Sequence, residues 1–202
     1  MKIIKYEKKS NDKYKIYLEN DQTINVYEDV ILKNNLLYKK EIDDSLLEKI
    51  SIDNDKEDMY NKCIKYISVR IRSRYEIIEY LRRKETDNIE VENILERLEK
   101  NDLIDDDKFA KAFIHDKLMF STMGPYRIQE ELKKHKINSS IISKYINDID
   151  EEIIDNKINK QITKLMKSNR KKQNLRNKIY TNLLSLGYSN EMIIRNINNY
   201  EI

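Results

Sequence analysis

Alternating apolar and polar residues over positions 1–30 predict three short antiparallel β-strands, because successive side chains of a strand point to opposite faces. The turn pairs Asn11-Asp12 and Asn20-Asp21 separate the three runs. Three short strands bury little surface alone, so we expect this meander to pack on the segment that follows it. The apolar positions of the three runs are Ile4, Tyr6, Tyr14, Ile16, Leu18, Ile24 and Val26.

The pattern changes after the meander. Residues 28–50 predict one or two short helices, and the charged stretch SIDNDKED at 51–58 predicts a polar link. From residue 59 to the end the apolar period is helical and predicts nine helices. We therefore expect a mainly α protein preceded by a small β meander.

The helical part repeats itself every 51 residues. Leu81, Leu132 and Leu183 share this spacing. Apolar columns that keep one spacing over three copies predict tandem units that stack on one another. The predicted divisions are 1–58 for the meander, short helices and link, then three-helix repeats at 59–106, 107–150 and 151–202. The other columns are Ile77/Ile128/Ile179, Val91/Ile142/Ile193, Leu95/Ile146/Ile197 and Leu98/Ile149/Tyr200.

The same helix of the repeat is predicted to begin in two different ways. Ser73 with Glu76 three residues later forms a capping-box sequence. Gly124 and Pro125 lie 51 residues after Ser73 and Arg74, and proline suits the first position of a helix because its missing amide would be unpaired there. The third copy has Leu175 at this place, which predicts a less sharply specified start.

Composition then excludes several classes. With 39% hydrophobic and 37% charged residues the chain reads as a globular protein, and no apolar run is long enough to cross a membrane. The single cysteine, Cys63, is predicted to be a small buried residue in a reducing compartment. We expect a cytoplasmic monomer with no cofactor and no membrane partner.

Few residues suggest catalysis. The two histidines, His115 and His135, fall on different predicted helices without a partner at catalytic or metal-ligand spacing. The run Asp105-Asp106-Asp107 precedes an apolar helix, so helix capping is favoured over a metal cluster. The sequence predicts neither catalytic residues nor metal ligands, and hence no enzyme.

Basic residues are the candidates for partner or DNA binding. Residues 158–202 hold nine Lys and Arg but two acidic residues, and none of the acids lies between 156 and 190. At about 100° per residue, lysines at 160, 164, 167 and 171 form one stripe opposite Ile158 and Ile162. The candidate positions are Arg70, Arg72, Arg74, Arg82, Arg83, Lys84, Arg127, Lys133, Lys134, Lys160, Lys164, Lys167, Lys171, Lys172, Arg176 and Lys178.

These basic positions also allow simpler explanations. Cations at a helix C-terminus complement its dipole, as at Arg82-Arg83-Lys84 and at Lys133-Lys134. A basic surface can also serve solubility alone.

Three stretches of the chain resemble a known family, the RecX regulators of the bacterial RecA recombinase. They are RIRSRYEIIEYL at 70–81, LEKNDLIDDDKFAKAFI at 98–114, and Gly124-Pro125-x-Arg127-Ile128-x-x-Glu131-Leu132. The second is similar to that family's Leu-x-x-x-Gly-Leu-Leu-Asp-Asp-x-x-Phe-Ala segment. Asp102 and Lys136 stand where the family usually has glycine, so we expect those two helix ends to be looser or differently terminated.

The resemblance implies a non-enzymatic modulator. Such a protein would be an elongated, curved helical module that binds the RecA filament on single- or double-stranded DNA and reduces ATP hydrolysis and strand exchange. Two alternatives stay open, a stand-alone DNA-binding protein and a generic helical scaffold for another protein. Acidic residues near two of the three third-helix starts, such as Glu90, argue against base readout by a recognition helix.

Overall fold

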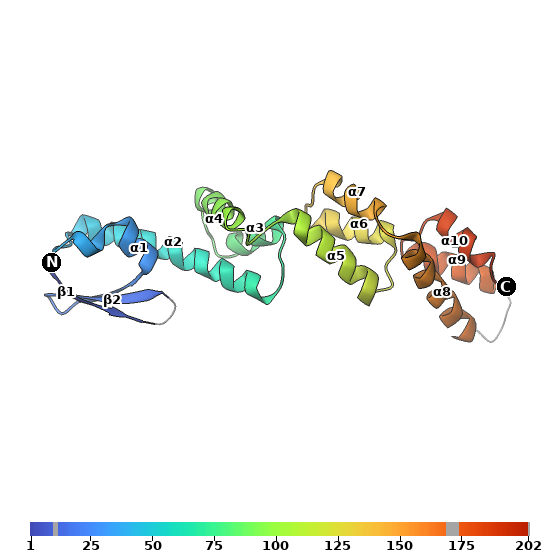
Figure 1. Cartoon of the computed structure of the whole chain (residues 1–202), viewed down its shortest axis with the longest axis horizontal. Helices are drawn as coiled ribbons and strands as arrows, with labels where there is room; N and C mark the ends of the chain where they lie inside the picture. The colour runs from blue at the N-terminus through green and yellow to red at the C-terminus, as the bar shows by residue number, and fades with distance from the viewer. Residues whose placement is uncertain (10–11, 169–173, 202) are drawn as a thin grey trace. The chain divides into compact units, whose positions relative to one another are not determined.

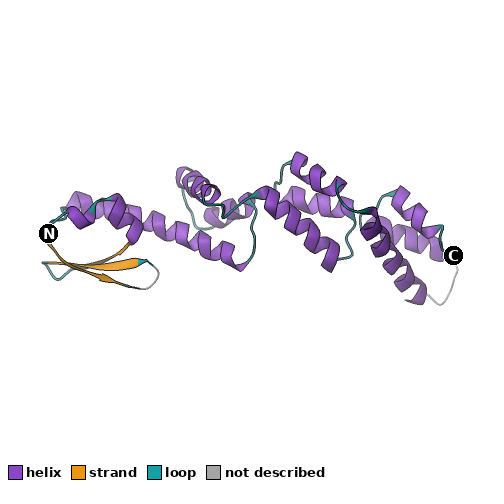
Figure 2. Ribbon diagram, in the orientation of Figure 1, coloured by secondary structure: helices purple, strands orange, loops and turns teal. Residues whose placement is uncertain are grey.

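The computed structural model describes residues 1–9, 12–168 and 174–201. This part of the chain is mainly helical, with three strands, one 3-10 helix and ten α-helices (Figures 1 and 2). None of the helices in the described ranges is both long and apolar enough to cross a membrane. The chain divides into two compact units, Met1–Arg70 with Thr86–Arg97, and Ile71–Glu85 with Leu98–Ile202. The predicted four-part division stays a prediction.

The N-terminal strands form the predicted meander. β1 (Ile3–Lys8), β2 (Lys13–Leu18) and β3 (Thr23–Tyr27) pair antiparallel in the order β1-β2-β3. Asp12 and Asp21 take the left-handed conformation at the two turns, with φ of 53° and 59°. Ile4 departs from the predicted inward position: the register shifts between Ile3 and Lys5, and Ile4 is 63% exposed.

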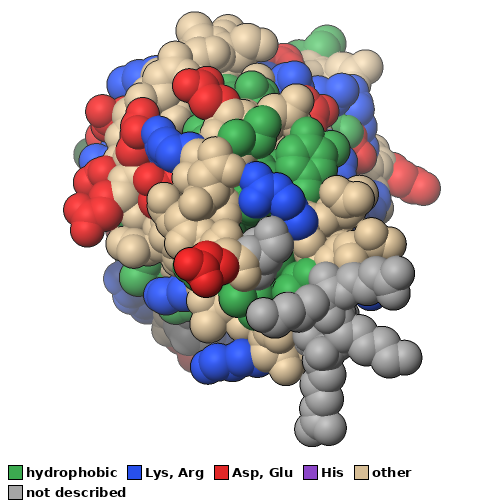
Figure 3. All heavy atoms as spheres, turned by 90° about the vertical axis from the view of Figure 1, so that its right-hand side faces the viewer, with side chains coloured by type: hydrophobic (Ala, Val, Ile, Leu, Met, Phe, Trp, Pro, Cys, Tyr) green, Lys and Arg blue, Asp and Glu red, His purple; other side chains and the backbone are tan. Residues whose placement is uncertain are grey.

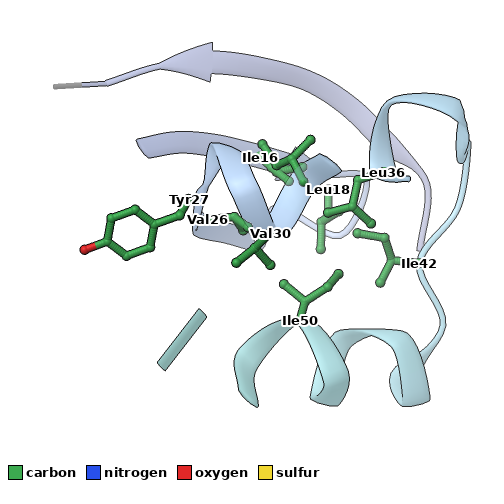
Figure 4. Close-up of a cluster of buried hydrophobic side chains, with 9 residues drawn as sticks. Ile16, Leu18, Val26, Tyr27, Val30, Leu36, Ile42 and Ile50 are labelled. Carbon is green, nitrogen blue, oxygen red and sulfur yellow. The ribbon is translucent and has the colours of Figure 1, made fainter. Parts of the chain in front are cut away.

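One face of the sheet is covered by the segment that follows it. Ile16, Leu18 and Val26 of the sheet are fully or almost fully buried. Their neighbours come from α1 (Glu28–Lys33), the 3-10 helix η1 (Leu36–Tyr38) and the start of α2 (Asp44–Val69). Figure 4 shows the cluster, with the Tyr27 hydroxyl pointing away from the other labelled side chains.

The polar link predicted at residues 51–58 is wrong, because α2 continues through it to Val69. Its buried residues follow a helical stripe that begins at Ile50 and ends at Cys63. Two positions of that stripe are acids, Asp53 and Glu57, and so the stripe is invisible to a search for apolar residues. Cys63 is fully buried as predicted, and burial raises the pKa of its thiol to about 12.

Both buried acids have cationic partners. Asp53 accepts hydrogen bonds from Lys33 at 2.7 Å and from the Asn34 amide at 2.9 Å. Glu57 accepts two hydrogen bonds from the Arg97 guanidinium, at 2.5 and 3.1 Å. These pairs allow a charged stripe to lie inside the unit, because each carboxylate keeps partners in place of water.

The remaining helices confirm the nine predicted for the helical part, within the described residues and counting the end of α2. Their buried columns also agree with the repeat: Ile77, Ile128, Ile179, Leu81, Leu132 and Leu183 are all 0% exposed. The helices that follow α2 are α3 (Arg74–Arg82), α4 (Asn88–Lys100), α5 (Asp106–Phe120), α6 (Pro125–Lys134), α7 (Ser139–Asn147), α8 (Glu151–Ser168), α9 (Leu175–Ser185) and α10 (Asn190–Ile197).

The predicted helix starts are present. The Ser73 hydroxyl and the Glu76 carboxylate form a reciprocal capping box at α3. Gly124 is the N-cap of α6 and Pro125 is its first residue. At α9 the N-cap is Asn174, which has a left-handed φ of 61° and no side-chain cap bond. This start is the less specified one, as predicted.

The only two glycines of the chain touch each other. The Gly124 amide donates to the carbonyl of Leu186 at 2.8 Å, and the Tyr126 amide donates to the carbonyl of Gly187 at 3.1 Å. A Cβ on Gly124 would lie 2.6 Å from the Gly187 carbonyl carbon, and a Cβ on Gly187 would lie 2.5 Å from the Arg127 nitrogen. The start of α6 therefore meets the end of α9 backbone to backbone.

Three middle helices of the repeat end in the same conformation. Glu85, Lys136 and Gly187 are 51 residues apart and have φ of 57°, 58° and 91°. At Lys136 and Gly187 the following amides, of Ile137 and Tyr188, bond back five residues as in a Schellman motif. Asp102 is left-handed too, with φ of 56°. The expectation of a different termination at Asp102 and Lys136 is wrong, since both residues adopt the glycine-like conformation.

We expect Gly124→Ala to lower the free energy of unfolding by about 1–3 kcal/mol, because the new methyl group would overlap the backbone of Gly187. Urea unfolding followed by circular dichroism measures this. Thr122→Ala in the same loop is exposed and should change stability by less than about 0.5 kcal/mol. Equal stability of the two variants would contradict the backbone contact.

We expect Lys136→Gly to raise the free energy of unfolding by about 1 kcal/mol, because it removes the steric cost of a side chain at φ 58°. The same change at exposed Lys111, inside α5, should lower stability by about 1 kcal/mol. Thermal unfolding of both variants provides the comparison, and a loss of stability at residue 136 would refute the strain argument.

Candidate nucleic-acid and partner interface

The lysine stripe predicted on the third repeat lies on α8. Lys160, Lys164 and Lys167 are exposed, while Ile158 and Ile162 are 0% exposed on the opposite side of the helix. The predicted stripe is thus confirmed for three of its four lysines. Lys171 and Lys172 lie outside the described residues.

The α8 face, as we call this surface, is hollowed and rich in hydrogen-bond donors. Within the described part of the chain, no carboxylate forms an ion pair with its three lysines. The amides of Asn156 and Asn159 lie beside the ammonium groups and can donate to phosphate oxygens, whereas the Thr163 hydroxyl donates to the Asn159 carbonyl at 2.8 Å. A depression of about 520 Å³ is lined by Asn156, Asn159, Lys160, Thr163, Lys164 and Lys167.

A fourth lysine of α8 has a structural role. The Lys157 ammonium donates to the carbonyls of Lys117, Leu118 and Ser121, at 3.2, 2.6 and 2.8 Å. These carbonyls end α5, so Lys157 caps the C-terminus of a helix in the preceding repeat. Burial, and secondarily the charge of Lys160, lowers the pKa of Lys157.

Other cations of the last helices are exposed, but some of them have hydrogen-bond or ion-pair partners. Arg176 on α9 donates to the Asn198 side chain at 2.7 Å, and Lys178 is exposed. Arg195 on α10 pairs with Glu151 and Asp155 of α8, at 2.7 and 2.8 Å. Figure 3 accordingly shows acidic and basic side chains interspersed on the face it displays. Lys160, Lys164 and Lys167 of α8 therefore differ from Arg195, which two carboxylates neutralise.

The predicted cations of α6 are mostly paired. Lys133 and Lys134 each form an ion pair of 2.7 Å with the glutamate three residues earlier, Glu130 and Glu131. Arg127 is exposed, and its guanidinium donates to the carbonyl of Ser185 at 3.3 Å. These neighbours reduce the net charge that α6 presents to a partner.

Some of the arginines around α3 are also held by acidic partners, while others are more exposed. Arg72 has a side chain only 11% exposed and lies 3.7 Å from Glu76. Arg74 pairs with Glu99 at 3.0 Å, and its amide donates to Asp106 at 2.8 Å. These two arginines therefore help to hold the fold.

The other cations of this group are more exposed. Arg70 is the exposed C-cap of α2. Arg82 pairs with Glu79 at 3.0 Å, and the Arg83 side chain donates to the Glu79 carbonyl at 3.1 Å. The Lys84 ammonium lies 5.9 Å from the centre of the Tyr80 ring.

The groups considered for catalysis have other roles. His135 packs on the rings of Phe109 and Phe113, with centroid distances of 5.1 and 5.4 Å. Asp105 caps α5, as predicted, by accepting hydrogen bonds from the backbone amides of Asp107 and Lys108. Asp107 instead binds Lys144 and Tyr145 of α7. Among the described residues, no group of three His, Cys, Asp or Glu side chains is placed to hold a metal ion.

The sequence reasoning missed one basic cluster. Lys5 and Lys15 lie on the sheet face opposite the core, and Lys65 lies on α2. The signal was present in the run KYKIYL of β2, where positions 13, 15 and 17 must share a face opposite to Ile16 and Leu18. Charge counts over long segments conceal it, because residues 1–59 are acidic in sum.

Comparisons with known proteins identify the helical units. Residues 60–98 match the family model "RecX, first three-helix domain", and residues 105–146 match "RecX, second three-helix domain". The regulatory protein RecX of Listeria innocua is 32% identical over 196 residues, which cover 95% of this chain and 73% of that protein.

Solved structures of RecX proteins are among those similar to this chain. A crystal structure of a regulatory protein RecX, 24% identical, covers 98% of both chains with a TM-score of 0.83 and supports the fold. The crystal structure of RecX from Lactobacillus salivarius, 26% identical, covers 72% of this chain and 96% of that one with a TM-score of 0.66.

We expect Lys157→Met to lower the free energy of unfolding by about 1.5–3 kcal/mol, because it leaves carbonyls at the end of α5 without a charged donor. Lys160→Met, one turn further on the exposed side, should change stability by less than about 0.5 kcal/mol. Chemical denaturation of the two variants distinguishes the capping lysine from its surface neighbour. Similar stabilities would show that Lys157 does not cap α5.

Proposed function

Because the chain belongs to the RecX family of regulatory proteins, we propose that it binds the RecA recombinase filament on DNA and lowers the ATPase and strand-exchange activities of RecA. The protein would act in the cytoplasm as a monomer, without catalytic residues or a cofactor. The family name supports regulation, while inhibition and filament binding are the proposed steps.

The single observation that carries the proposal is the α8 face. Three exposed lysines lie on one side of a helix whose other side is buried, and no described carboxylate pairs with them. Such a surface attracts a partner of high negative charge, and a DNA-loaded filament is one. The side-chain amides of Asn156 and Asn159 can add neutral hydrogen bonds to phosphate oxygens beside the charged contacts.

The cations elsewhere contribute less in this proposal. Lys133 and Lys134 would have to give up glutamate partners before they met a phosphate. Arg70, Arg82 and Arg83 remain exposed and would add long-range attraction.

We expect the purified chain, at saturation, to reduce the DNA-dependent ATPase of its cognate RecA. Replacing Lys160, Lys164 and Lys167 together by Gln should weaken this effect and lower the salt slope of duplex binding by about 2.7, at ~0.9 per phosphate contact. Titrations at three salt concentrations measure the slope. Folding should change by less than about 1 kcal/mol, because all three side chains are exposed.

Lys108, Lys111 and Lys144 provide a matched control. They are exposed lysines of the same compact unit, and Lys108 and Lys144 lie 3.7 and 2.9 Å from Asp105 and Asp107. Their triple Gln variant should keep wild-type inhibition and salt slope. If the wild-type chain left RecA at full ATPase, the inhibitor proposal would be wrong. Equal slopes for wild type and the α8 variant would exclude this face as the DNA contact.

A further inference from the structure

We propose that the outer face of the N-terminal sheet is a contact surface for single-stranded nucleic acid. This sheet surface consists of Lys5, Lys15 and Tyr17, with the adjoining hollow between the β1–β2 end of the sheet and α2. It lies wholly in the first compact unit and is a site distinct from the α8 face.

The strand register places the three side chains together. Lys5 of β1 and Thr23 of β3 are both paired with Tyr17 of β2, and Lys15 is two residues before Tyr17 on the same face. The opposite face carries Ile16 and Leu18, which are 0% and 1% exposed in the core. Packing of the inner face thus obliges the lysines and the tyrosine to face outward.

The Tyr17 ring is held in a cationic setting. The ammonium of Lys5 lies 4.4 Å from the ring centre and that of Lys15 lies 5.2 Å from it. The Tyr17 hydroxyl donates to Glu7 at 2.5 Å, which orients the ring. Hydrogen bonds from Lys9 and then Tyr17 lower the pKa of Glu7 to about 2. Its carboxylate therefore stays ionised and keeps this orienting contact at neutral pH.

The hollow at the other end of β2 has a volume of about 260 Å³. Asp58 of α2 organises it by accepting the Tyr27 hydroxyl at 2.7 Å, Lys62 at 2.8 Å and Lys13 at 3.2 Å. Hydrogen bonds from Lys62, and then from Tyr27, lower the pKa of Asp58. The acid thus gathers two ammonium groups at the rim, to which Lys65 adds a third.

Cations exceed carboxylates on this surface. Six lysines share it with the carboxylates of Glu7, beside Tyr17, and Asp58, in the hollow. Lys5, Lys15 and Lys65 have no ion pair with a described carboxylate. The six lysines are Lys5, Lys9, Lys13, Lys15, Lys62 and Lys65.

The geometry favours a single strand over a duplex. Proteins that hold single strands combine a cationic path for phosphates with an aromatic ring on which an unstacked base can lie. Tyr17 and the hollow beside Lys13 are four residues apart along β2, roughly 13 Å at ~3.3 Å per residue. A flexible strand can follow this short path and place a base at Tyr17 and a phosphate in the hollow. The bases of a duplex are stacked and not available to the ring.

The first test replaces Lys5, Lys15 and Lys65 by Gln in the full chain and measures binding of a labelled dT oligonucleotide at three salt concentrations. Three lost phosphate contacts should lower the salt slope by about 2, at ~0.7 per contact on a single strand. The matched control replaces Lys39, Lys40 and Lys49, three exposed lysines of the same unit, and should keep the wild-type slope. Circular dichroism checks that both variants fold.

The second test addresses the ring. Tyr17→Thr keeps a residue that suits a strand but removes the stacking platform. Wild-type protein should bind dT more tightly than an abasic oligonucleotide of equal length, and this preference should fall by about tenfold in the variant. A merely structural role of Tyr17 would weaken binding to both oligonucleotides alike and would overturn the stacking assignment.

Three outcomes would refute the proposal that the sheet surface binds single-stranded nucleic acid, and none of them would contradict the proposed function. One is an unchanged oligonucleotide affinity and salt slope in the Lys5/Lys15/Lys65 variant. Another is an equal loss in the control variant. The last is unchanged oligonucleotide binding together with lost binding to RecA, which would make this a protein contact. The Lys160/Lys164/Lys167 variant, measured in parallel, tests the α8 face independently.

Discussion

The second and third repeats depend on one backbone contact. The first amides of α6 have no partner within their own helix, and the carbonyls that follow α9 have none within theirs. Gly124 and Gly187 let these two helix ends approach closely enough to satisfy each other. Lys157 and the Tyr188 hydroxyl, which donates to the Thr122 carbonyl at 3.2 Å, reinforce the same joint. The joint also sets the position of α8, because Lys157 ties that helix to the end of α5.

The lysines of α8 fall into two kinds, one that stabilises the fold and others that are free to bind a partner. Lys157 turns toward neighbouring carbonyls and is used by the fold, while Lys160 and Lys164 face outward with no described carboxylate beside them. The paired Lys133 and Lys134 of α6 lie between these extremes. An exposed cation without an ion pair attracts a negatively charged partner with its full charge. A carboxylate beside an ion-paired cation cancels part of that attraction. The state of pairing, more than the count of basic residues, therefore distinguishes the α8 face.

In the N-terminal unit the acidic residues likewise divide into buried, ion-paired ones and one that lies at the surface. Asp53 and Glu57 occupy the buried stripe of α2 and are held by Lys33 and Arg97. Asp58, one residue further along α2, points toward the sheet. Its carboxylate binds lysines that stay at the rim of the hollow and are not buried. Acidic residues that lower the net charge of this region thus organise a locally cationic surface. A segment with negative net charge can carry a basic surface because burial and pairing remove the acids from it.

The sequence by itself determined the local structure. Strand alternation, helical period, the Ser73 capping box and Pro125 are decided by residues within a few positions of one another, and the structure agrees with them except at Ile4, where the register of β1 shifts. The 51-residue spacing likewise predicted the buried columns, and the outward lysines of α8 followed from the helical angle alone. Local patterns failed where a distant partner changed the meaning of a residue. Asp53 reads as a link residue until Lys33 is placed beside it.

Only the tertiary structure decided which charges are available and why both glycines are needed. The contact of Gly124 with Gly187 joins residues more than sixty positions apart, and no local pattern encodes it. The left-handed Lys136 shows the same limit, since the surrounding repeat imposes a conformation that its side chain disfavours. Pairing of cations and burial of acids are properties of neighbours in space. They arise after the chain has folded, and so the sequence could propose the basic positions but not rank them.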